Sequence, residues 1–201
     1  MNEKFFDIKK EKQDRILNAA LKAFALHGYR HASTDDIVRD AAVSKGILFH
    51  YFGSKSGLYA FLFDYSVKYM IFEYDRIITK KSTDYFEVRK EMEKAKLNVL
   101  RNYPYMSQFI DSGVCENTLD VIATIEESKN TYLETLENYT ANTSKGNLHP
   151  SMEQSRIENL IRYTVDGLTN DQLREGCYQP EMLYQQICSY IDTIKTLAVQ
   201  P

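Results

Sequence analysis

Apolar residues recur every three or four positions over most of the chain, as they do on the buried face of an α-helix. One such stripe lies in residues 9–27 and is expected to end at Gly28, a residue that readily forms a left-handed cap. A longer stripe follows Ser54. Further helices are predicted over residues 85–101, 104–112, 118–139, 152–168 and 180–199. No strand-like alternation is sustained, so the pattern predicts an all-α protein.

Two short helices are predicted just before the long one. Ser33 and Asp36 have the spacing of a capping box, which predicts a helix over residues 34–41. Ser44 can cap a second helix over residues 45–51. Two short helices joined by three or four residues and followed by a long helix form the layout of a helix-turn-helix that reads DNA.

This region resembles the N-terminal domain of the tetracycline-repressor (TetR) family of bacterial transcription regulators. The matching residues are Thr34, Ile37, Ala41, Val43, Ser44, Lys45, Gly46, Leu48, Phe49, Tyr51, Phe52, Lys55 and Leu58, with Ile16, Ala20, Phe24, Gly28 and Tyr29 upstream. The resemblance implies a three-helix DNA-binding domain over residues 1–55 and a larger helical ligand-binding and dimerisation domain over residues 56–201. The second part matches only in length and helical character, which leaves the effector, the operator and the regulated genes open.

The charge of the chain is unevenly distributed. The 201 residues carry 25 Lys and Arg against 28 Asp and Glu, a net charge of −3. Residues 1–55 hold ten basic against seven acidic side chains, whereas residues 56–201 hold fifteen against twenty-one. The basic excess therefore lies in the part that resembles a DNA-binding domain. Because the excess is modest, hydroxyls, amides and helix N-termini are expected to supply further phosphate contacts.

The candidate DNA contacts fall into three groups. Helix starts and one later cation are expected to hold phosphates: Ser33, Thr34, Ser44 and Lys55. Lys45, Gly46 and Ile47 are expected to face bases, as a donor to guanine, a point of close backbone approach and a contact for a thymine methyl. The resemblance places His50 and Tyr51 beside the DNA backbone. The same serines would act as ordinary helix caps without DNA.

Aromatic residues mark the second part of the chain. The sequence contains 15 Tyr and 10 Phe but no Trp, and most of them follow residue 55. An aromatic stripe is usually core, yet tyrosines with a few polar neighbours can also line a pocket for a small apolar ligand. The resemblance implies such a cavity, and its candidate residues are Tyr65, Tyr69, Tyr103, Phe109, Tyr132, Tyr163 and Asp166.

The last two predicted helices are strongly amphipathic. Their apolar positions are Ile157, Leu160, Ile161, Val165 and Leu168, then Leu183, Ile187, Tyr190, Ile191, Ile194 and Leu197. These helices could simply close the core of one protomer. The resemblance implies that they pair with the same helices of a second subunit as a four-helix bundle, so a homodimer is expected.

Several other kinds of protein are not indicated. Cys115, Cys177 and Cys188 are odd in number and lack C-x-x-C spacing, so they are expected to be buried thiols. The four histidines form no metal-ligand pattern, and neither a metal nor another cofactor is expected. No apolar run suits a signal peptide or a membrane span, which predicts a cytoplasmic protein that does not bind membranes.

The sequence thus supports a ligand-responsive transcriptional regulator, interpreted as a repressor that binds a palindromic double-stranded DNA operator as a homodimer and is released by a small-molecule effector. The alternative is an all-α ligand-binding or adaptor protein that has lost sequence-specific DNA binding. The acidic balance and Asp35, an anion on the predicted DNA-facing surface, favour this alternative. An enzyme is disfavoured because no nucleophile–base, paired-carboxylate or phosphate-loop pattern was found.

Overall fold

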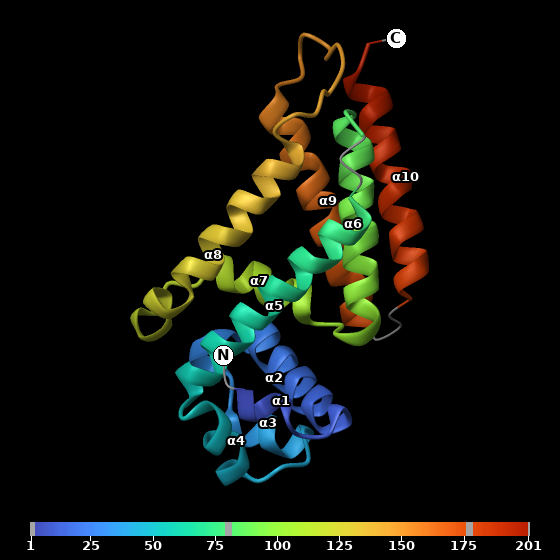
Figure 1. Ribbon diagram of the computed structural model, residues 1–201. Coiled ribbons are helices and arrows are strands. Elements are labelled where there is room, and N and C mark those ends of the chain that lie inside the picture. Colours follow the sequence, from blue (N-terminus) through green and yellow to red (C-terminus); the bar gives the residue numbers. More distant parts are fainter. Residues whose placement is uncertain (1–2, 79–81, 176–178, 201) are drawn as a thin grey trace. The chain divides into compact units, whose positions relative to one another are not determined.

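The computed structural model describes residues 3–78, 82–175 and 179–200, and within them the chain forms ten α-helices (Figure 1). They are α1 (Glu3–Phe6), α2 (Lys10–His31), α3 (Thr34–Asp40), α4 (Lys45–Phe52), α5 (Lys55–Ile77), α6 (Tyr85–Asn102), α7 (Met106–Val114), α8 (Leu119–Thr140), α9 (Gln154–Glu175) and α10 (Pro180–Ala198). The all-α prediction is confirmed. The two short helices begin at Thr34 and Lys45, as their serine caps predicted.

The N-terminal region differs from the predicted pattern in two places. Helix α1 was not predicted, because four residues are too few to show a helical period. Its Phe5 is fully buried, with its ring centroid 5.1 Å from that of Phe52 and 5.4 Å from that of Phe61. Helix α2 breaks at Gly28, as predicted, but helical turns resume as far as His31. Gly28 has φ 65° and ψ 176°, a conformation that essentially only glycine adopts.

Contacts divide the described residues into two compact units. The first unit lies within Met1–Phe72 and Val99–Glu134, and the second lies within Glu73–Asn98 and Thr135–Pro201. Helices α5, α6 and α8 each contribute residues to both units. The division into functional domains after residue 55 is a separate matter and stays a prediction.

The core of the first unit is aromatic. Phe24, Tyr59 and Phe109 are almost fully buried, and the centroid of the Tyr59 ring lies 5.0 Å from that of Phe24 and 5.2 Å from that of Phe109. Ile37 of α3 and Leu48 of α4 are fully buried as well. Because one face of each short helix packs in this core, the opposite face can contact solvent or a partner.

The core of the second unit is built from the two amphipathic C-terminal helices and the start of α6. Figure 1 shows α9 and α10 running side by side, and they share the most extensive helix–helix contact of this unit. The buried residues of this core are Tyr85, Phe86, Ile157, Ile161, Val165, Leu183, Ile187, Ile191 and Ala198. The predicted apolar stripes of the last two helices are therefore at least partly used within a single protomer.

Two predictions about the whole chain can be compared with the structure. The expectation of buried thiols is wrong for Cys115, which is exposed, and Cys188 is half-buried, while Cys177 lies outside the described residues. Cys115 directly follows the last residue of α7, and its side chain is exposed there rather than packed in a core. Among the helices that the structure describes, none combines the length and the apolar character that crossing a bilayer demands.

Candidate nucleic-acid interface

Three serines cap the helices of the candidate interface. The Ser33 hydroxyl accepts the Asp36 amide at 3.3 Å, that of Ser44 accepts the Ile47 amide at 3.3 Å, and that of Ser54 accepts the Gly57 amide at 3.0 Å. The Asp36 carboxylate pairs with Arg39 at 2.7 Å, so the reciprocal half of the predicted capping box is replaced by an ion pair. A hydroxyl that accepts an amide still has its own proton to donate, which leaves a phosphate contact open to Ser33 and Ser44.

The turn between α3 and α4 is tightly hydrogen-bonded. The Ala42 amide donates to the Arg39 carbonyl at 3.1 Å, and the Val43 amide donates to the Val38 carbonyl at 3.0 Å. Ala42 has φ 52°, which side chains with a Cβ rarely adopt. This single left-handed residue reverses the chain between the two short helices and so fixes the direction in which α4 begins.

Helix α4 has a buried face and an outward face. Leu48 and Phe52 are buried, whereas Lys45, Gly46 and His50 are exposed. A Cβ added to Gly46 would approach only the Ser44 hydroxyl, at 3.9 Å, so no internal contact requires glycine there. The outward face at the start of α4 thus consists of a cation and bare backbone, as a helix that meets base edges requires.

The remaining predicted contacts are more enclosed. Ile47 and Thr34 are half-buried. Tyr51 is half-buried too, and its ring lies edge-on to Phe5 at 5.8 Å and to His50 at 5.1 Å. The aromatic ring of Tyr51 therefore packs within the domain, and any contact with DNA would come from its hydroxyl.

Lys45 is joined to Asp35 in an ion pair. The Nζ atom of Lys45 lies 2.8 Å from Oδ1 of Asp35, and both side chains are at least half exposed. The pair links the first turn of α3 to the first residue of α4. The sequence does not predict this ion pair, because nothing in a linear pattern shows that two side chains ten residues apart are partners.

Lys55 is engaged inside the domain as well. Its Nζ atom donates to the Arg30 carbonyl at 3.2 Å and lies 4.8 Å from the centroid of the Tyr29 ring. Partial burial lowers the pKa of Lys55. The cation therefore stabilises the C-terminal end of α2, and its predicted phosphate contact would have to be made alongside these interactions.

The predicted ligand-binding residues do not form one pocket. Tyr65, Tyr69 and Tyr103 are grouped in the first unit, where the hydroxyls of Tyr65 and Tyr103 lie 3.3 Å apart. The Tyr103 hydroxyl donates to Asp14 at 2.8 Å and accepts from Lys10 at 3.2 Å. Burial, together with the hydrogen bond to the Asp14 carboxylate, raises the pKa of Tyr103 to about 12. This network is already satisfied by protein groups.

The other four predicted ligand residues lie elsewhere. Phe109 belongs to the aromatic core of the first unit, and Tyr132 is also buried. Tyr163 and Asp166 lie in the second unit, where Tyr163 is 62% exposed. Arg162 connects these two residues, with its guanidinium 4.4 Å from the Tyr163 ring centroid and 4.0 Å from the Asp166 carboxylate. An exposed helix surface of this kind is not the aromatic cavity that was expected. The ligand-binding roles of these residues remain predictions.

A polar cavity of about 510 Å³ lies in the second unit instead. Asp75, Thr135, Asn138, Tyr139 and Asn142 line much of it, with the side chains of Ile78 and Val88 as apolar wall. The Tyr139 hydroxyl donates to Asp75 at 2.6 Å. This cavity could not be predicted from the sequence, because polar residues near helix ends have no periodicity that distinguishes a pocket from a solvated surface.

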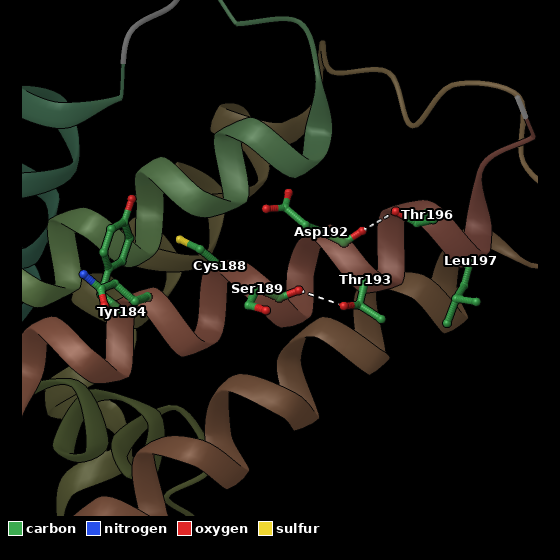
Figure 2. A pocket seen from close by; sticks show the side chains of 8 residues that line it. Tyr184, Cys188, Ser189, Asp192, Thr193, Thr196 and Leu197 are labelled. Carbon is green, nitrogen blue, oxygen red and sulfur yellow. Dashed lines mark hydrogen bonds between the residues drawn. The ribbon is translucent and has the colours of Figure 1, made fainter.

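A second depression follows the surface of α10. Figure 2 shows Tyr184, Cys188, Ser189, Asp192, Thr193, Thr196 and Leu197 along it. The Thr193 and Thr196 hydroxyls donate to the carbonyls of Ser189 and Asp192, both at 2.9 Å. All of its lining residues belong to one helix, and these two hydroxyls are already satisfied within it. We therefore assign it no ligand.

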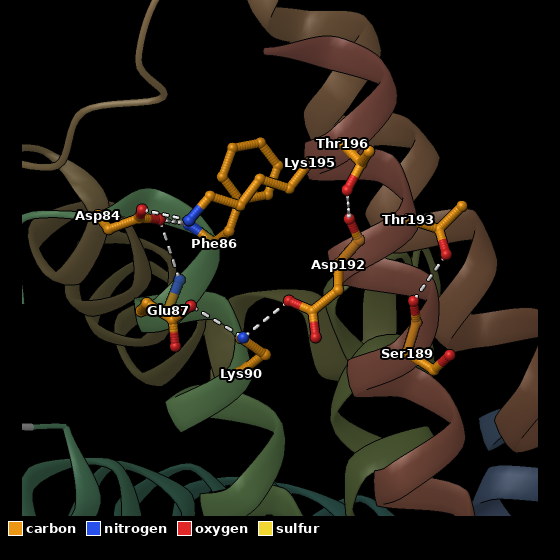
Figure 3. Close-up of polar contacts among 9 residues, drawn as sticks. All are labelled: Asp84, Phe86, Glu87, Lys90, Ser189, Asp192, Thr193, Lys195 and Thr196. Carbon is orange, nitrogen blue, oxygen red and sulfur yellow. Dashed lines mark hydrogen bonds and ion pairs between the residues drawn. The ribbon is translucent and has the colours of Figure 1, made fainter. Parts of the chain in front are cut away.

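Polar contacts attach α6 to α10 beside this depression (Figure 3). The Asp84 carboxylate accepts the Phe86 amide at 2.8 Å and the Lys195 ammonium at 2.6 Å. Lys90 of α6 lies 2.8 Å from Asp192 of α10. Burial disfavours the charged carboxylate, but the bond from Lys195 and those from the α6 amides outweigh it and lower the pKa of Asp84.

Both C-terminal helices also present large apolar side chains to solvent. The exposed residues are Leu160, Tyr163, Met182, Tyr190 and Leu197, between 45% and 68% accessible. Leu160 and Tyr163 lie three residues apart on α9, and Tyr190 and Leu197 lie seven residues apart on α10, so each helix presents more than one apolar side chain on one face, as an interaction surface would. Within the described residues, no three His, Cys, Asp or Glu side chains are placed to hold a metal ion.

Comparison with known proteins relates the N-terminal part of this chain to a family of bacterial regulators. Residues 16–61 match the family model described as bacterial regulatory proteins of the tetR family. The uncharacterized HTH-type transcriptional regulator YuxN of Bacillus subtilis (strain 168) is 30% identical over 112 residues, which are 56% of this chain but only 38% of YuxN.

Several solved structures have a similar fold over most of this chain. A TetR family transcriptional regulator from Chloroflexus aurantiacus J-10-FL superposes with a TM-score of 0.67 at 18% identity, over 99% of this chain and 98% of that one. The regulator FadR from Bacillus subtilis, in complex with stearoyl-CoA, gives 0.57 at 17% identity, over 88% and 96%. These likenesses show a common fold. Because the matched segment contains both short helices, their capped starts and the beginning of α5, this part of the chain is a helix-turn-helix domain of the TetR family of bacterial regulatory proteins.

Proposed function

We propose that this protein is a homodimeric repressor that binds a palindromic DNA operator and is released by a small-molecule effector. The outward face at the start of α4 carries this proposal, because Lys45 and Gly46 stand exposed on a helix whose other face is buried. Its N-terminal residues would enter the major groove. The capped starts of α3 and α4 would hold phosphates on either side.

Dimerisation would supply the second reading helix. The exposed apolar residues of α9 and α10 suit pairing with the same helices of a second copy, since a twofold interface joins identical surfaces. In such a dimer the two α4 helices would meet successive major grooves about 34 to 36 Å apart. This distance sets the spacing of the two half-sites, and the twofold symmetry of the dimer makes the operator a palindrome.

Effector release requires a ligand that prefers one state of the dimer. Helix α5 follows the reading helix directly and contributes residues to both compact units, so it is the element through which such a preference would act. A shift from mostly competent to mostly incompetent protein needs about 5.5 kcal/mol of differential affinity. The polar cavity around Asp75 is the candidate site within the described residues. The FadR structure with stearoyl-CoA supports ligand binding by this fold in general.

The test is selection of bound sequences from a randomised duplex pool, at two salt concentrations. The wild-type protein is expected to enrich a palindrome, and Lys45→Ala is expected to lose it. Lys94→Ala, which removes an exposed lysine of α6, is the matched control and should enrich the same palindrome. Enrichment of an identical sequence by the Lys45 variant would show that α4 does not read the operator.

The second candidate function is an all-α ligand-binding or adaptor protein without sequence-specific DNA binding. The ion pair between Lys45 and Asp35 favours it, because the one cation at the start of α4 is partly neutralised. Folded, dimeric wild-type protein that enriches no sequence and shows no salt-sensitive DNA binding would support this candidate. The family consists of transcription regulators rather than enzymes, so an enzymatic function is set aside.

A further inference from the structure

The ion pair at the tip of the candidate interface has no evident role in folding. Lys45 and Asp35 have 50% and 74% of their side-chain surface exposed, and ion pairs this exposed contribute little to stability. A carboxylate on a surface that approaches phosphates also weakens DNA binding through repulsion. The arrangement is explained more simply if the carboxylate has a partner on the DNA.

We propose that Asp35 and Lys45 together read one G·C base pair in each half of the operator, an inference that rests on the proposed DNA-binding function. The Lys45 ammonium would donate to O6 and N7 of guanine. The Asp35 carboxylate would accept from the N4 amino group of the paired cytosine. Asp35 thereby becomes a residue that determines which base pair is bound at this position.

The spacing of the two side chains matches the edge of this base pair. The donor Nζ and the acceptor Oδ1 lie 2.8 Å apart. In a G·C pair the acceptor O6 and the donor N4 are joined by a hydrogen bond, so they lie about 2.9 Å apart in the major groove. A donor–acceptor pair on the protein thus faces an acceptor–donor pair of nearly equal spacing on the DNA.

An A·T pair fits the same two side chains less well. Its major-groove edge offers the acceptor N7 and the donor N6 of adenine, then the acceptor O4 and the methyl group of thymine. A carboxylate placed at N6 would lie beside the lone pair of N7. The ammonium would meet a single acceptor next to a methyl group, whereas guanine offers two adjacent acceptors. The geometry therefore favours G·C.

Asp36 provides an internal control for charge. It is the next residue of α3, it is also exposed, and its carboxylate pairs with Arg39 rather than with Lys45. Asp36→Asn and Asp35→Asn each remove one negative charge from the same turn of the same helix. Only Asp35→Asn changes the group beside Lys45, so repulsion and base reading can be separated.

The experiment compares wild type, Asp35→Asn and Asp36→Asn by sequence selection, followed by affinity measurements on the recovered site and on versions with single base pairs changed. Wild type is expected to require G·C at one position of each half-site, with A·T there costing about tenfold or more in affinity. Asp35→Asn is expected to lose that preference or to favour A·T, because an amide pairs well with adenine. Other positions should not change, and Asp36→Asn should keep the wild-type preference.

Two results would overturn the inference in distinguishable ways. If Asp35→Asn bound every site more tightly by one common factor and kept the wild-type base preference, Asp35 would act by repulsion alone, and the proposed regulator function would stand. If folded wild-type protein enriched no palindrome, the regulator function and the inference would fail together. Thermal unfolding of each variant, compared with wild type, tests whether a lost base preference results from loss of the folded structure.

Discussion

Ala42 is the residue at which the backbone of the helix-turn-helix is most constrained. Its φ of 52° costs about 1–2 kcal/mol for a residue with a Cβ, whereas glycine adopts it freely. Glycine loses about 0.4–1 kcal/mol of this advantage through the greater entropy of its unfolded chain. Ala42→Gly is therefore expected to raise the free energy of unfolding by up to about 1.6 kcal/mol, measured by thermal or urea denaturation. Ala41→Gly, at a buried position with φ −76°, should instead destabilise. A loss of stability in both variants would contradict this account.

Gly46 separates the demands of folding from those of DNA binding. The added methyl group of Gly46→Ala would meet only the Ser44 hydroxyl at 3.9 Å, and alanine favours a helix by up to about 1 kcal/mol over glycine. We expect unchanged or slightly higher stability but at least about tenfold weaker operator binding, since the methyl group holds the backbone away from the groove. Fluorescence anisotropy on the selected operator measures the second effect. Wild-type affinity in a stable Gly46→Ala protein would show that α4 does not approach DNA closely at this point.

Sequence reasoning at the residue scale identified local interactions and missed the longer ones. The caps at Ser33, Ser44 and Ser54 were predictable, because a cap joins a side chain to an amide three residues away. The partnership of Lys45 with Asp35 was not, because it depends on how the turn folds back. The attachment of Lys55 to the end of α2 was missed for the same reason.

At the scale of elements, the helical period located the long helices but not their ends. Helix α9 continues to Glu175, past the predicted end at Leu168, because its last turns have mixed composition rather than a clear apolar stripe. Helix α7 begins at Met106, two residues after Pro104. Contacts between helices, such as those that attach α6 to α10, leave no periodic trace in either helix.

Acid is expected to weaken the attachment of α6 to α10 through Asp84. Because the pKa of Asp84 is lowered in the folded protein, its contribution to stability is present above the unfolded pKa of about 3.9 and is lost as the pH falls through the lower folded value. Asp84→Asn should cost about 1 kcal/mol or less at pH 7, since the Asp84 and Lys195 side chains are 38% and 35% exposed.

Urea denaturation of wild type and Asp84→Asn from pH 7 to pH 2 tests this expectation. The difference in stability between the two proteins should be constant above about pH 5 and should shrink towards pH 2. Asp171→Asn, at an exposed position of α9, is the matched control. A difference between wild type and Asp84→Asn that did not depend on pH would mean that the charge of Asp84 is not what stabilises the contact.

At the scale of the whole molecule, the fold class followed from the sequence, whereas the candidate effector site did not. The resemblance implies a cavity lined by aromatic residues, yet Phe109 and Tyr132 are core residues and Tyr163 is exposed. The cavity around Asp75 draws instead on residues of α5, α6 and α8 and the segments beside them, and most of these residues are polar. Such a site depends on three-dimensional packing that no single helix reveals.

Dimerisation is the whole-molecule property on which operator recognition depends. Tyr190 of α10 is 47% exposed, and in a twofold interface each substitution there occurs on both subunits. Tyr190→Glu would bury two uncompensated charges, so we expect a monomer at micromolar concentration in sedimentation experiments. A monomer contacts one half-site at a time, and its affinity for the full palindrome should fall by about a hundredfold or more.

Leu119→Glu makes a comparable change at a leucine of α8 that is 86% exposed, and it should leave both the dimer and operator binding intact. If Leu119→Glu dissociated the protein while Tyr190→Glu remained dimeric, the subunits would be joined through the first unit rather than through the C-terminal helices.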